Sequence, residues 1–576
     1  MKPSFLAVLP LLAALVAGCR AEPVGSNPAV GGADTIYLGA ILTIDDAHPR
    51  AEALAVKDGR ILAVGSKSDV LSRKGAGTKV VELGAKALVP GFVDAHSHFS
   101  AVGLQALSAN LLPPPDGPVK SIAELQAVLR EFIAKSPTVK AYGLAIGFNY
   151  DDSQLAEQRS PTAEELDQVS TTVPILVIHQ SAHLAVLNTM ALAKAGWSAA
   201  SPDPTGGVIR RKQGGQEPNG VLEENAFFLS LPKLLPKFTA EQGLEQLHAA
   251  QAIYLANGFT TVQDGRTDPP TLALLAAAAK AGTFVIDVVS YPDLDQNAKD
   301  PILHGPWMAP GYASHFRLGG VKLTFDGSPQ GKTAWMTQPY LEVPEGQPAS
   351  YVGYPSFPDA KKAADLVKLA YQNHWQLLVH ANGDAAIEQL LDDVRAASAA
   401  FPGADRRTTL IHGQYVREDQ VARMKELGIF PALFPMHTFY WGDWHRDSVA
   451  GPERAENISP MGWLAQRGMP FSIHSDAPVT FPNSMRVLDS AVNRTTRSGR
   501  VLGPQHRLEP LVALKAMTLW SAHQHFEEKT KGSLAVGKLA DLVILDGNPV
   551  EVDPKTLKDL KVVETIKEGR TVYRAR

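Results

Sequence analysis

Short apolar runs alternate with amphipathic stretches through the middle of the chain. Eight runs have the length and composition of buried strands: residues 92–95, 260–264, 285–290, 320–325, 377–380, 409–412, 430–434 and 471–474. Segments with helical spacing of apolar residues lie between them, at 271–281, 359–373, 384–399 and 417–427. Strands that alternate with helices favour parallel pairing, and eight such units predict an α/β fold, a (β/α)8 TIM barrel, over residues 91–525.

This region is much longer than the about 250 residues that are typical of a bare barrel. The excess lies between the first two predicted strands, at 99–250. That stretch contains apolar runs of its own at 142–146 and 174–178 and a Pro-Thr-Gly-Gly turn at 204–207. We therefore predict an insertion after strand 1, which would act as a lid over the substrate.

Residues 34–90 and 526–576 share a different pattern of short β-forming runs separated by tight turns. Asp58-Gly59 predicts a hairpin near one end, and Asp-Gly-Asn-Pro at 546–549 marks a turn near the other. The similar pattern predicts one small β domain built from both termini. Two separate β appendages are the alternative.

The first 19 residues carry Lys2 and then an apolar run from 5 to 16, which is too short to span a bilayer and is typical of an export signal. Val-Ala-Gly-Cys at 16–19 resembles a bacterial lipoprotein signal, which implies cleavage before Cys19 and a lipid on its sulfur. Residues 20–33 are rich in Gly and Pro and predict a flexible tether. We expect an exported lipoprotein that faces the periplasm or the exterior and touches the membrane only through Cys19. A secreted or periplasmic soluble protein is the alternative.

The composition narrows the chemistry that the chain can perform. Its 576 residues are 45% hydrophobic and 20% charged, with a net charge of −4. This is a globular balance without the basic field that nucleic acid requires, so we expect no nucleic-acid partner. A single Cys excludes an intramolecular disulfide and a Cys-based zinc site. With 17 His residues in the chain, a metal site would use imidazole and oxygen ligands.

Polar side chains that can bind a metal follow the predicted strands. His96 and His98 lie two residues apart after the first strand, so both side chains can point the same way. The fifth and sixth strands end at His380 and His412, and Asp476 follows the eighth. Such strand ends meet at one rim of a barrel, and a buried polar group needs a partner, so these five residues predict a metal site. Buried histidines satisfied by backbone carbonyl groups are the alternative.

Several of these residues lie in motifs that resemble those of the amidohydrolase superfamily. The motifs are His-Ser-His at 96–98, Gly-Val-Lys at 320–322, His-Ala-Asn-Gly-Asp at 380–384, Leu-Ile-His-Gly at 410–413 and His-Ser-Asp-Ala-Pro at 474–478. The segment 531–543 resembles the small β domain of that superfamily. Phe-Asp-Gly-Ser at 325–328 and Ser-Ala-His at 181–183 are similar to the amidohydrolase-3 branch, which includes YtcJ-like proteins and N-substituted formamide deformylases. The resemblance covers about residues 35–575 of the chain.

The resemblance implies a role for each residue. His96 and His98 would bind the more buried of two zinc or other divalent ions, and His380 and His412 would bind the second. Asp476 would also ligate the first ion. As the catalytic residue it would accept the proton of the attacking water and pass it to the leaving amine.

The same resemblance implies that Lys322, in the fourth strand, bridges the two ions as an N6-carboxylated carbamate. An ammonium has no lone pair for a metal, so Lys322 can be a ligand only as a carbamate or as a neutral amine. A salt bridge to Asp326 or Asp264, beside a single ion, is the alternative. We favour the carbamate, and the choice decides between one metal ion and two rather than the class of reaction.

Three further residues are predicted to contact the substrate. His183, in the insertion, would reach over the rim of the barrel, and Asp326 follows the fourth strand. Trp441 belongs to an aromatic segment at 434–444, which would line the pocket with flat apolar walls.

Together these features predict a metal-dependent hydrolase that cleaves an amide-type C–N bond of a small or medium organic substrate. A zinc ion lowers the pKa of its bound water to about 7, which makes the water nucleophilic at neutral pH. A deaminase or an esterase that uses the same site, and a non-catalytic lipid-tethered binding protein, are the alternatives. No pattern in the sequence predicts an oligomeric state.

Overall fold

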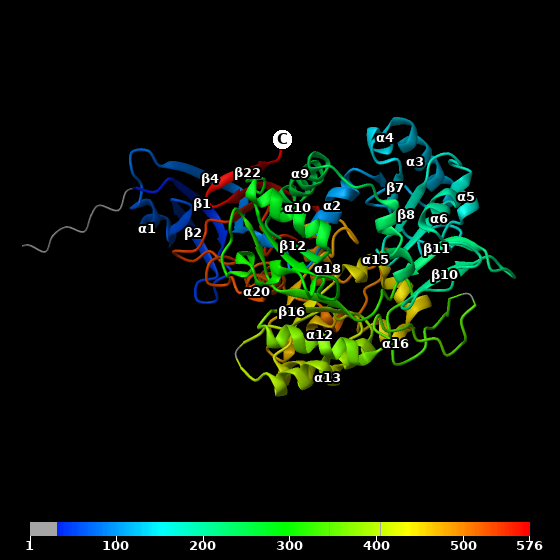
Figure 1. Cartoon of the computed structure of the whole chain (residues 1–576). Coiled ribbons are helices and arrows are strands. Elements are labelled where there is room, and N and C mark those ends of the chain that lie inside the picture. Colours follow the sequence, from blue (N-terminus) through cyan, green and yellow to red (C-terminus); the bar gives the residue numbers. More distant parts are fainter. Residues whose placement is uncertain (1–31, 345, 404) are drawn as a thin grey trace, which may run out of the picture.

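The computed structural model describes residues 32–344, 346–403 and 405–576 (Figure 1). The predicted export signal, Cys19 and most of the predicted tether lie outside these residues. Two sheets of parallel strands occupy the middle of the molecule, with a seven-stranded sheet at one end and a six-stranded sheet at the other. None of the helices in the described part of the chain combines the length and the apolar character that crossing a bilayer requires.

The two central sheets contain a strand at each of the eight predicted positions. One sheet has the order β14 (Phe316–Leu318), β13 (Asp287–Pro292), β12 (Phe259–Thr267) and β5 (Phe92–Val93). The other has the order β15 (Val321–Thr324), β16 (Leu377–Ala381), β17 (Thr409–His412), β18 (Phe430–Leu433) and β19 (Ser472–Ile473). All neighbours in both sheets are parallel. The chain therefore has an α/β fold with parallel sheets, and its closure into a barrel stays a prediction.

The two sheets are divided at Gly319 and Gly320, between β14 and β15. A Cβ on Gly319 would lie 2.4 Å from the ring of Tyr291, and a Cβ on Gly320 would lie 2.2 Å from the backbone oxygen of Gln376. Glycine permits this close packing at both positions. Before the two glycines β14 pairs with β13, and after them β15 pairs with β16. The sequence pattern predicts one strand at 320–325, so the separate strand β14 is a feature that the pattern does not show.

Helices follow the parallel strands as the pattern predicts. The four predicted helices correspond within two residues to α10 (Pro269–Lys280), α12 (Ala360–Gln372), α13 (Asp384–Ala400) and α14 (Glu418–Leu427). In α13, for example, the buried residues have the spacing of one helical face: Ile387, Leu390, Leu391 and Val394. This face joins the core that the parallel sheets form.

The six-stranded sheet lies entirely within the predicted insertion. Its order is β10 (Gly207–Arg211), β11 (Pro218–Glu224), β9 (Leu184–Leu187), β8 (Ile175–His179), β7 (Ala145–Tyr150) and β6 (Ala109–Asn110). The apolar run at 142–146 becomes a strand only from Ala145. Tyr142 instead ends α4 (Pro137–Tyr142), and Gly143 adopts a left-handed φ of 61°. The chain returns to β12 through α9 (Ala240–Ala256).

Strands from both ends of the chain form the seven-stranded sheet. β1 (Thr35–Leu42), β2 (Arg50–Lys57), β3 (Arg60–Gly65) and β4 (Lys79–Pro90) precede the parallel sheets, and β20 (Leu542–Leu545), β21 (Val562–Lys567) and β22 (Arg570–Arg574) follow them. β4 joins the two groups, because it pairs parallel with β1 and antiparallel with β20. The two ends of the chain therefore share one sheet, and its status as a separate domain stays a prediction.

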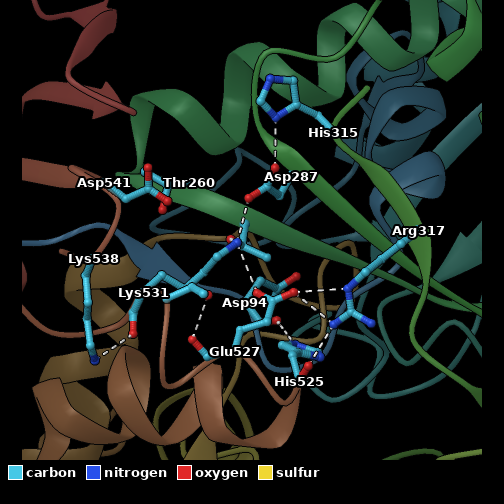
Figure 2. Close-up of polar contacts among 12 residues, drawn as sticks. Asp94, Thr260, Asp287, His315, Arg317, His525, Glu527, Lys531, Lys538 and Asp541 are labelled. Atoms are coloured by element: carbon cyan, nitrogen blue, oxygen red, sulfur yellow. Dashed lines mark hydrogen bonds and ion pairs between the residues drawn. The ribbon is translucent and has the colours of Figure 1, made fainter. Parts of the chain in front are cut away.

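Buried ion pairs attach this sheet to β13 (Figure 2). Oδ2 of Asp287 lies 2.5 Å from Nζ of Lys531 and 2.6 Å from Nζ of Lys567 in β21. Lys531 also lies 3.0 Å from Glu527, which pairs with Arg317 at 2.8 Å. All five side chains are buried, and burial of an unpaired charge is costly. Each cation of the cluster therefore faces a carboxylate.

Candidate metal centre

The ends of β5, β16, β17 and β19 bring the predicted metal ligands together. His96 and His98 follow β5, His380 and His412 lie near the ends of β16 and β17, and Asp476 follows β19. Nε2 of His96 and Nε2 of His98 each lie 3.4 Å from Oδ1 of Asp476, and Nε2 of His412 lies 3.9 Å from its Oδ2. Nδ1 of His380 is 3.0 Å from Nε2 of His412. The five side chains therefore surround one site.

Backbone contacts fix the two loops that carry three of these five side chains. The N–H of Asp476 donates to the carbonyl oxygen of His96 at 3.2 Å, and the N–H of His98 donates to that of Ala477 at 2.7 Å. Asp476 and His412 adopt positive φ values of 53° and 74°. Such values are rare outside glycine and concentrate at functional sites. The backbone itself therefore helps to aim these two side chains at the site.

Hydrogen bonds to the outer ring nitrogens orient the first histidine pair. Nδ1 of His96 lies 2.6 Å from Oε1 of Gln263, and Nδ1 of His98 lies 2.7 Å from the backbone oxygen of Gly265. Both partners are acceptors, so each Nδ1 carries the proton. Each Nε2 then presents a lone pair toward Asp476, which is the arrangement that metal-binding histidines adopt.

The second histidine pair presents its free nitrogens in the same way. Nε2 of His380 lies 3.2 Å from the backbone oxygen of Gly327 and 3.1 Å from Nδ2 of Asn382. With the proton on Nε2 and donated to Gly327, Nδ1 has the lone pair. That lone pair faces Nε2 of His412, so either a proton or a shared cation must lie between them. Oδ1 of Asp476 is buried and has no hydrogen-bond partner among the described residues. These donor atoms fit a divalent metal ion.

Burial sets the charge of the site. Burial, reinforced by Lys322 and neighbouring rings, holds the pKa of His96, His380 and His412 well below the usual value of 6.5. A neutral imidazole is the form that binds a metal. Burial opposes ionisation of Asp476, but its contacts with His98, His474 and Lys322 outweigh this effect and bring the pKa of its carboxyl below 3.8. The site therefore combines neutral rings with an ionised carboxylate.

Lys322 lies beside these rings. Its Nζ is 3.0 Å from Nε2 of His96, and no carboxylate oxygen of the described residues lies within 4.0 Å of it. Asp326 and Asp264 therefore do not form the salt bridge that was the alternative. Burial is the main cause that lowers the pKa of Lys322 to about 7.

A cavity of about 340 Å³ opens above the predicted ligands. His98, Lys322, His380, His412 and Asp476 line its floor. The insertion supplies a largely apolar wall, which includes Phe148, Ile178, Phe227, Phe228 and Leu231. The side chains that fit a metal therefore lie at the bottom of a space that can hold a small organic molecule.

Of the three predicted substrate contacts, only His183 lines the cavity. Asp326 is fully buried and accepts hydrogen bonds from three backbone N–H groups at 2.8–3.0 Å. Trp441 is also fully buried, and its Nε1 donates to Asp151 at 2.8 Å. Asp326 and Trp441 support neighbouring loops instead, because folding turns both side chains away from the cavity.

The structure adds three residues that sequence patterns do not single out. Gln263 orients His96, and its only signal is a polar side chain inside an apolar strand. Glu224 binds Nδ1 of His183 at 2.7 Å, and contacts with His183 and Thr333 outweigh its burial and bring the pKa of its carboxyl below the usual value. Arg266 stacks over the ring of Phe228 at 4.2 Å on the cavity wall.

Comparison with known proteins agrees with this site. N-substituted formamide deformylase of Arthrobacter pascens is 28% identical over 550 residues, which cover 92% of this chain and 97% of that protein. Putative amidohydrolase YtcJ of Bacillus subtilis is 27% identical over 549 residues, which cover 93% of this chain and 98% of that protein. The solved structure of an uncharacterized metal-dependent hydrolase from Pyrococcus horikoshii has a TM-score of 0.69 at 22% identity, and the alignment covers 90% of this chain and 99% of that one. This last likeness concerns the fold alone.

The sequence profile of the Amidohydrolase family matches residues 79–573. The match spans both parallel sheets, the insertion and most of the seven-stranded sheet. It confirms the resemblance that the strand-end motifs indicate. The chain therefore belongs to the amidohydrolase family of hydrolases.

Proposed function

We propose that this protein is a metal-dependent hydrolase that cleaves the C–N bond of a small organic amide. The observation that carries the proposal is the convergence of four imidazoles and one carboxylate, of which His98, His380, His412 and Asp476 line the cavity. His96, His98 and Asp476 would hold one ion, and His380 and His412 a second. When bound, zinc or another divalent ion polarises a carbonyl group and lowers the pKa of a water to about 7.

Asp476 is the residue that moves the proton in this proposal. Its carboxylate lies at the cavity floor and is ionised at neutral pH, so it can accept a proton from the attacking water. The water oxygen bonds to the carbonyl carbon, and Asp476 then delivers the proton to the nitrogen as the C–N bond breaks. The products are a carboxylic acid and an amine.

We further propose that Lys322 is carboxylated. A pKa near 7 leaves much of the side chain as a neutral amine at neutral pH, and that is the form that attacks CO2. A bond forms between Nζ and the carbon of CO2, one proton leaves, and a singly negative carbamate results. Its two oxygens would supply negative charge at a position that has no carboxylate partner within 4.0 Å among the described residues, and would bridge two ions.

The apolar wall favours a substrate with an apolar substituent. Phe227 and Phe228 in α7 (Asn225–Phe228) and Leu231 in α8 (Leu231–Leu234) offer contact to aryl or alkyl groups rather than to a charged polymer. The relative from Arthrobacter pascens is by its name a deformylase of N-substituted formamides. Formamides with an arylalkyl group on nitrogen are therefore the first substrates to test.

The deciding experiment combines metal analysis with a substrate panel. Purified protein is expected to contain zinc or another divalent ion, to hydrolyse arylalkyl formamides, and to lose that activity on chelation and regain it with zinc. His412→Ala should abolish both metal retention and activity, whereas His248→Ala, at an exposed position of α9, should preserve both. Esters and amino-heterocycles in the same panel distinguish an esterase or a deaminase. A protein without metal, indifferent to chelation, would support the non-catalytic alternative.

Export and lipidation at Cys19 remain part of the proposal on sequence grounds. Labelling of cells with an alkyne-tagged fatty acid should mark the wild-type protein and not Cys19→Ser. Equal labelling of the two would contradict the lipoprotein prediction.

A further inference from the structure

His183 brings an additional imidazole to the cavity from the insertion. It lies between β8 and β9, and its ring centroid is 5.1 Å from that of His380 and 6.2 Å from that of Phe228. Its side chain is 12% exposed and belongs to the cavity wall. His183 is not among the five ligands of the candidate metal centre, so the proposed hydrolysis leaves its role open.

Glu224 fixes this imidazole. Its Oε2 lies 2.7 Å from Nδ1 of His183, and its backbone N–H donates to the carbonyl oxygen of His183 at 2.8 Å. Its Oε1 accepts from Oγ1 of Thr333 at 2.7 Å, and that hydroxyl oxygen accepts from the backbone N–H of Ser328 at 2.9 Å. Both carboxylate oxygens of Glu224 are therefore acceptors. It follows that Nδ1 of His183 carries a proton.

Glu224 is buried and has an unusual backbone conformation, unlike a residue in a surface ion pair. Its φ of 47° and ψ of −120° form a conformation that L-residues rarely adopt and that concentrates at functional sites. A Cβ on Gly327 would lie 2.2 Å from its Oε1. The carbonyl oxygen of the same Gly327 accepts from Nε2 of His380. Gly327 therefore contacts both Glu224 and His380, and it connects the Glu224–His183 pair to the candidate metal centre.

The tautomer of His183 decides what it can bind. With the proton on Nδ1, the neutral ring has a lone pair on Nε2. No described residue forms a hydrogen bond with that nitrogen, and the ring lies on the cavity wall. In this neutral form of the ring, Nε2 binds a hydrogen-bond donor.

We propose that Nε2 of His183 accepts a hydrogen bond from the N–H of the scissile amide, with Glu224 as its positioning residue. This inference rests on the proposed amide hydrolysis and narrows its substrate class. A site built to pair with an N–H discriminates against the analogue that lacks it, because its own polar group is then left unpaired. The substrates are amides that carry an N–H and an apolar substituent, in preference to tertiary amides.

The test compares N-(2-phenylethyl)formamide with its N-methyl derivative on the zinc-loaded enzyme. The wild type should favour the N–H compound at least tenfold in kcat/KM. His183→Phe removes the acceptor and keeps a planar ring, so it should bring this ratio close to one. His183→Gln retains an acceptor oxygen and should restore part of the ratio.

Glu224→Gln tests the positioning role. The amide nitrogen of the new side chain can donate to Nδ1, which would shift the ring proton to Nε2 and remove the acceptor. We expect the same loss of the substrate ratio, with unchanged zinc content and circular dichroism. Glu223→Gln is the matched control. Glu223 is the preceding residue of β11 and is also buried, but it pairs with Arg210 and does not line the cavity, so the ratio should be preserved.

Two results would overturn the inference. One is a wild-type ratio near one. The other is a loss of kcat/KM that is equal for both compounds in His183→Phe and Glu224→Gln, which would indicate a purely structural pair. If the wild type hydrolyses neither compound, the proposed function fails for formamides. Calorimetric titration of both compounds then tests His183 separately, and equal affinities or no binding would overturn its role.

Discussion

Nδ1 of His380 faces Nε2 of His412 at 3.0 Å, while the opposite nitrogen of His380 is bound to the backbone of Gly327. Either a proton on Nε2 of His412 or a shared cation must lie between these two nitrogens, and in the proposed function that partner is a metal ion. The stability of the protein should therefore depend on the metal. A ligand that binds only the folded state at 1,000 times its Kd stabilises it by about 4 kcal/mol.

We expect chelation to lower the Tm of the wild type and zinc to restore it. His412→Ala should lose most of this zinc-dependent increase, whereas the exposed control His248→Ala should keep it. Differential scanning fluorimetry with and without chelator measures the effect. A Tm that is indifferent to metal in the wild type would contradict the assignment.

Asp476→Asn should separate metal binding from catalysis. The amide can still coordinate through oxygen but cannot accept a proton, and removal of a general acid–base group costs about 10²–10⁴-fold in rate. We expect kcat to fall by that factor with most of the metal retained, as measured by steady-state kinetics and elemental analysis. An unchanged kcat would remove Asp476 from the mechanism.

Lys322→Ala should reduce the metal content toward one ion per chain. Short carboxylic acids such as acetate or propionate should partly restore activity, because they can occupy the place of the carbamate. Lys332→Ala is the control, since Lys332 donates to Ser448 and does not line the cavity. Two ions per chain in Lys322→Ala would exclude the bridge.

Phe228→Ala should weaken binding of arylalkyl formamides. Loss of about 50 Å² of apolar contact corresponds to about 1.3 kcal/mol, or close to a tenfold rise in KM. Leu229→Ala is the matched control, because this neighbouring side chain is 51% exposed and does not line the cavity. Unsubstituted formamide, which lacks the apolar group, should show no difference between these proteins. The prediction fails if all substrates respond alike.

The buried ion cluster of Figure 2 should make stability depend on pH. Burial raises the pKa of Asp287, but Lys531 and Lys567 outweigh it and hold the value well below 3.8; similar pairing lowers the pKa of Glu527 to about 2. Both folded-state pKa values are depressed. Their stabilisation is therefore complete above the unfolded values of about 4 and is lost as the pH falls toward 2.

Asp287→Asn should destabilise the protein at pH 7 by about 3–5 kcal/mol, because it leaves buried ammonium groups short of a partner. The difference from the wild type should shrink between pH 4 and pH 2. Thermal unfolding across this range measures it. Asp46→Asn removes a partner of Lys515 that is 82% exposed, and it should have little effect at any pH.

Strand ends and helix boundaries could be predicted from the sequence because they depend on local patterns. The ligands His380 and His412 directly terminate apolar runs, and parallel strands bring such ends to one side. α13 and α14 follow from helical spacing of apolar residues together with Gly428 at the end of α14.

Features that depend on packing between distant segments could not be predicted. Glu224 and His183 lie 41 residues apart, and no periodic pattern relates them. An aromatic segment looks the same whether its rings line a cavity or fill a core. In α15 (Met436–Trp444) the ring of Trp441 fills the core, and its Nε1 donates to Asp151 of the insertion. The division of the sheets at Gly319 likewise depends on the ring of Tyr291, which is remote in sequence.

The sheet shared by the two ends has a consequence for biosynthesis. β4 gains its neighbour β20 only after residues 542–545 have been made, so one edge of β4 stays open while most of the chain is already synthesised. Lys567, a counter-charge of Asp287, is translated later still. Folding can therefore be completed only after β20 and β21 have been made, and a chain truncated before β20 would have an exposed, aggregation-prone strand edge.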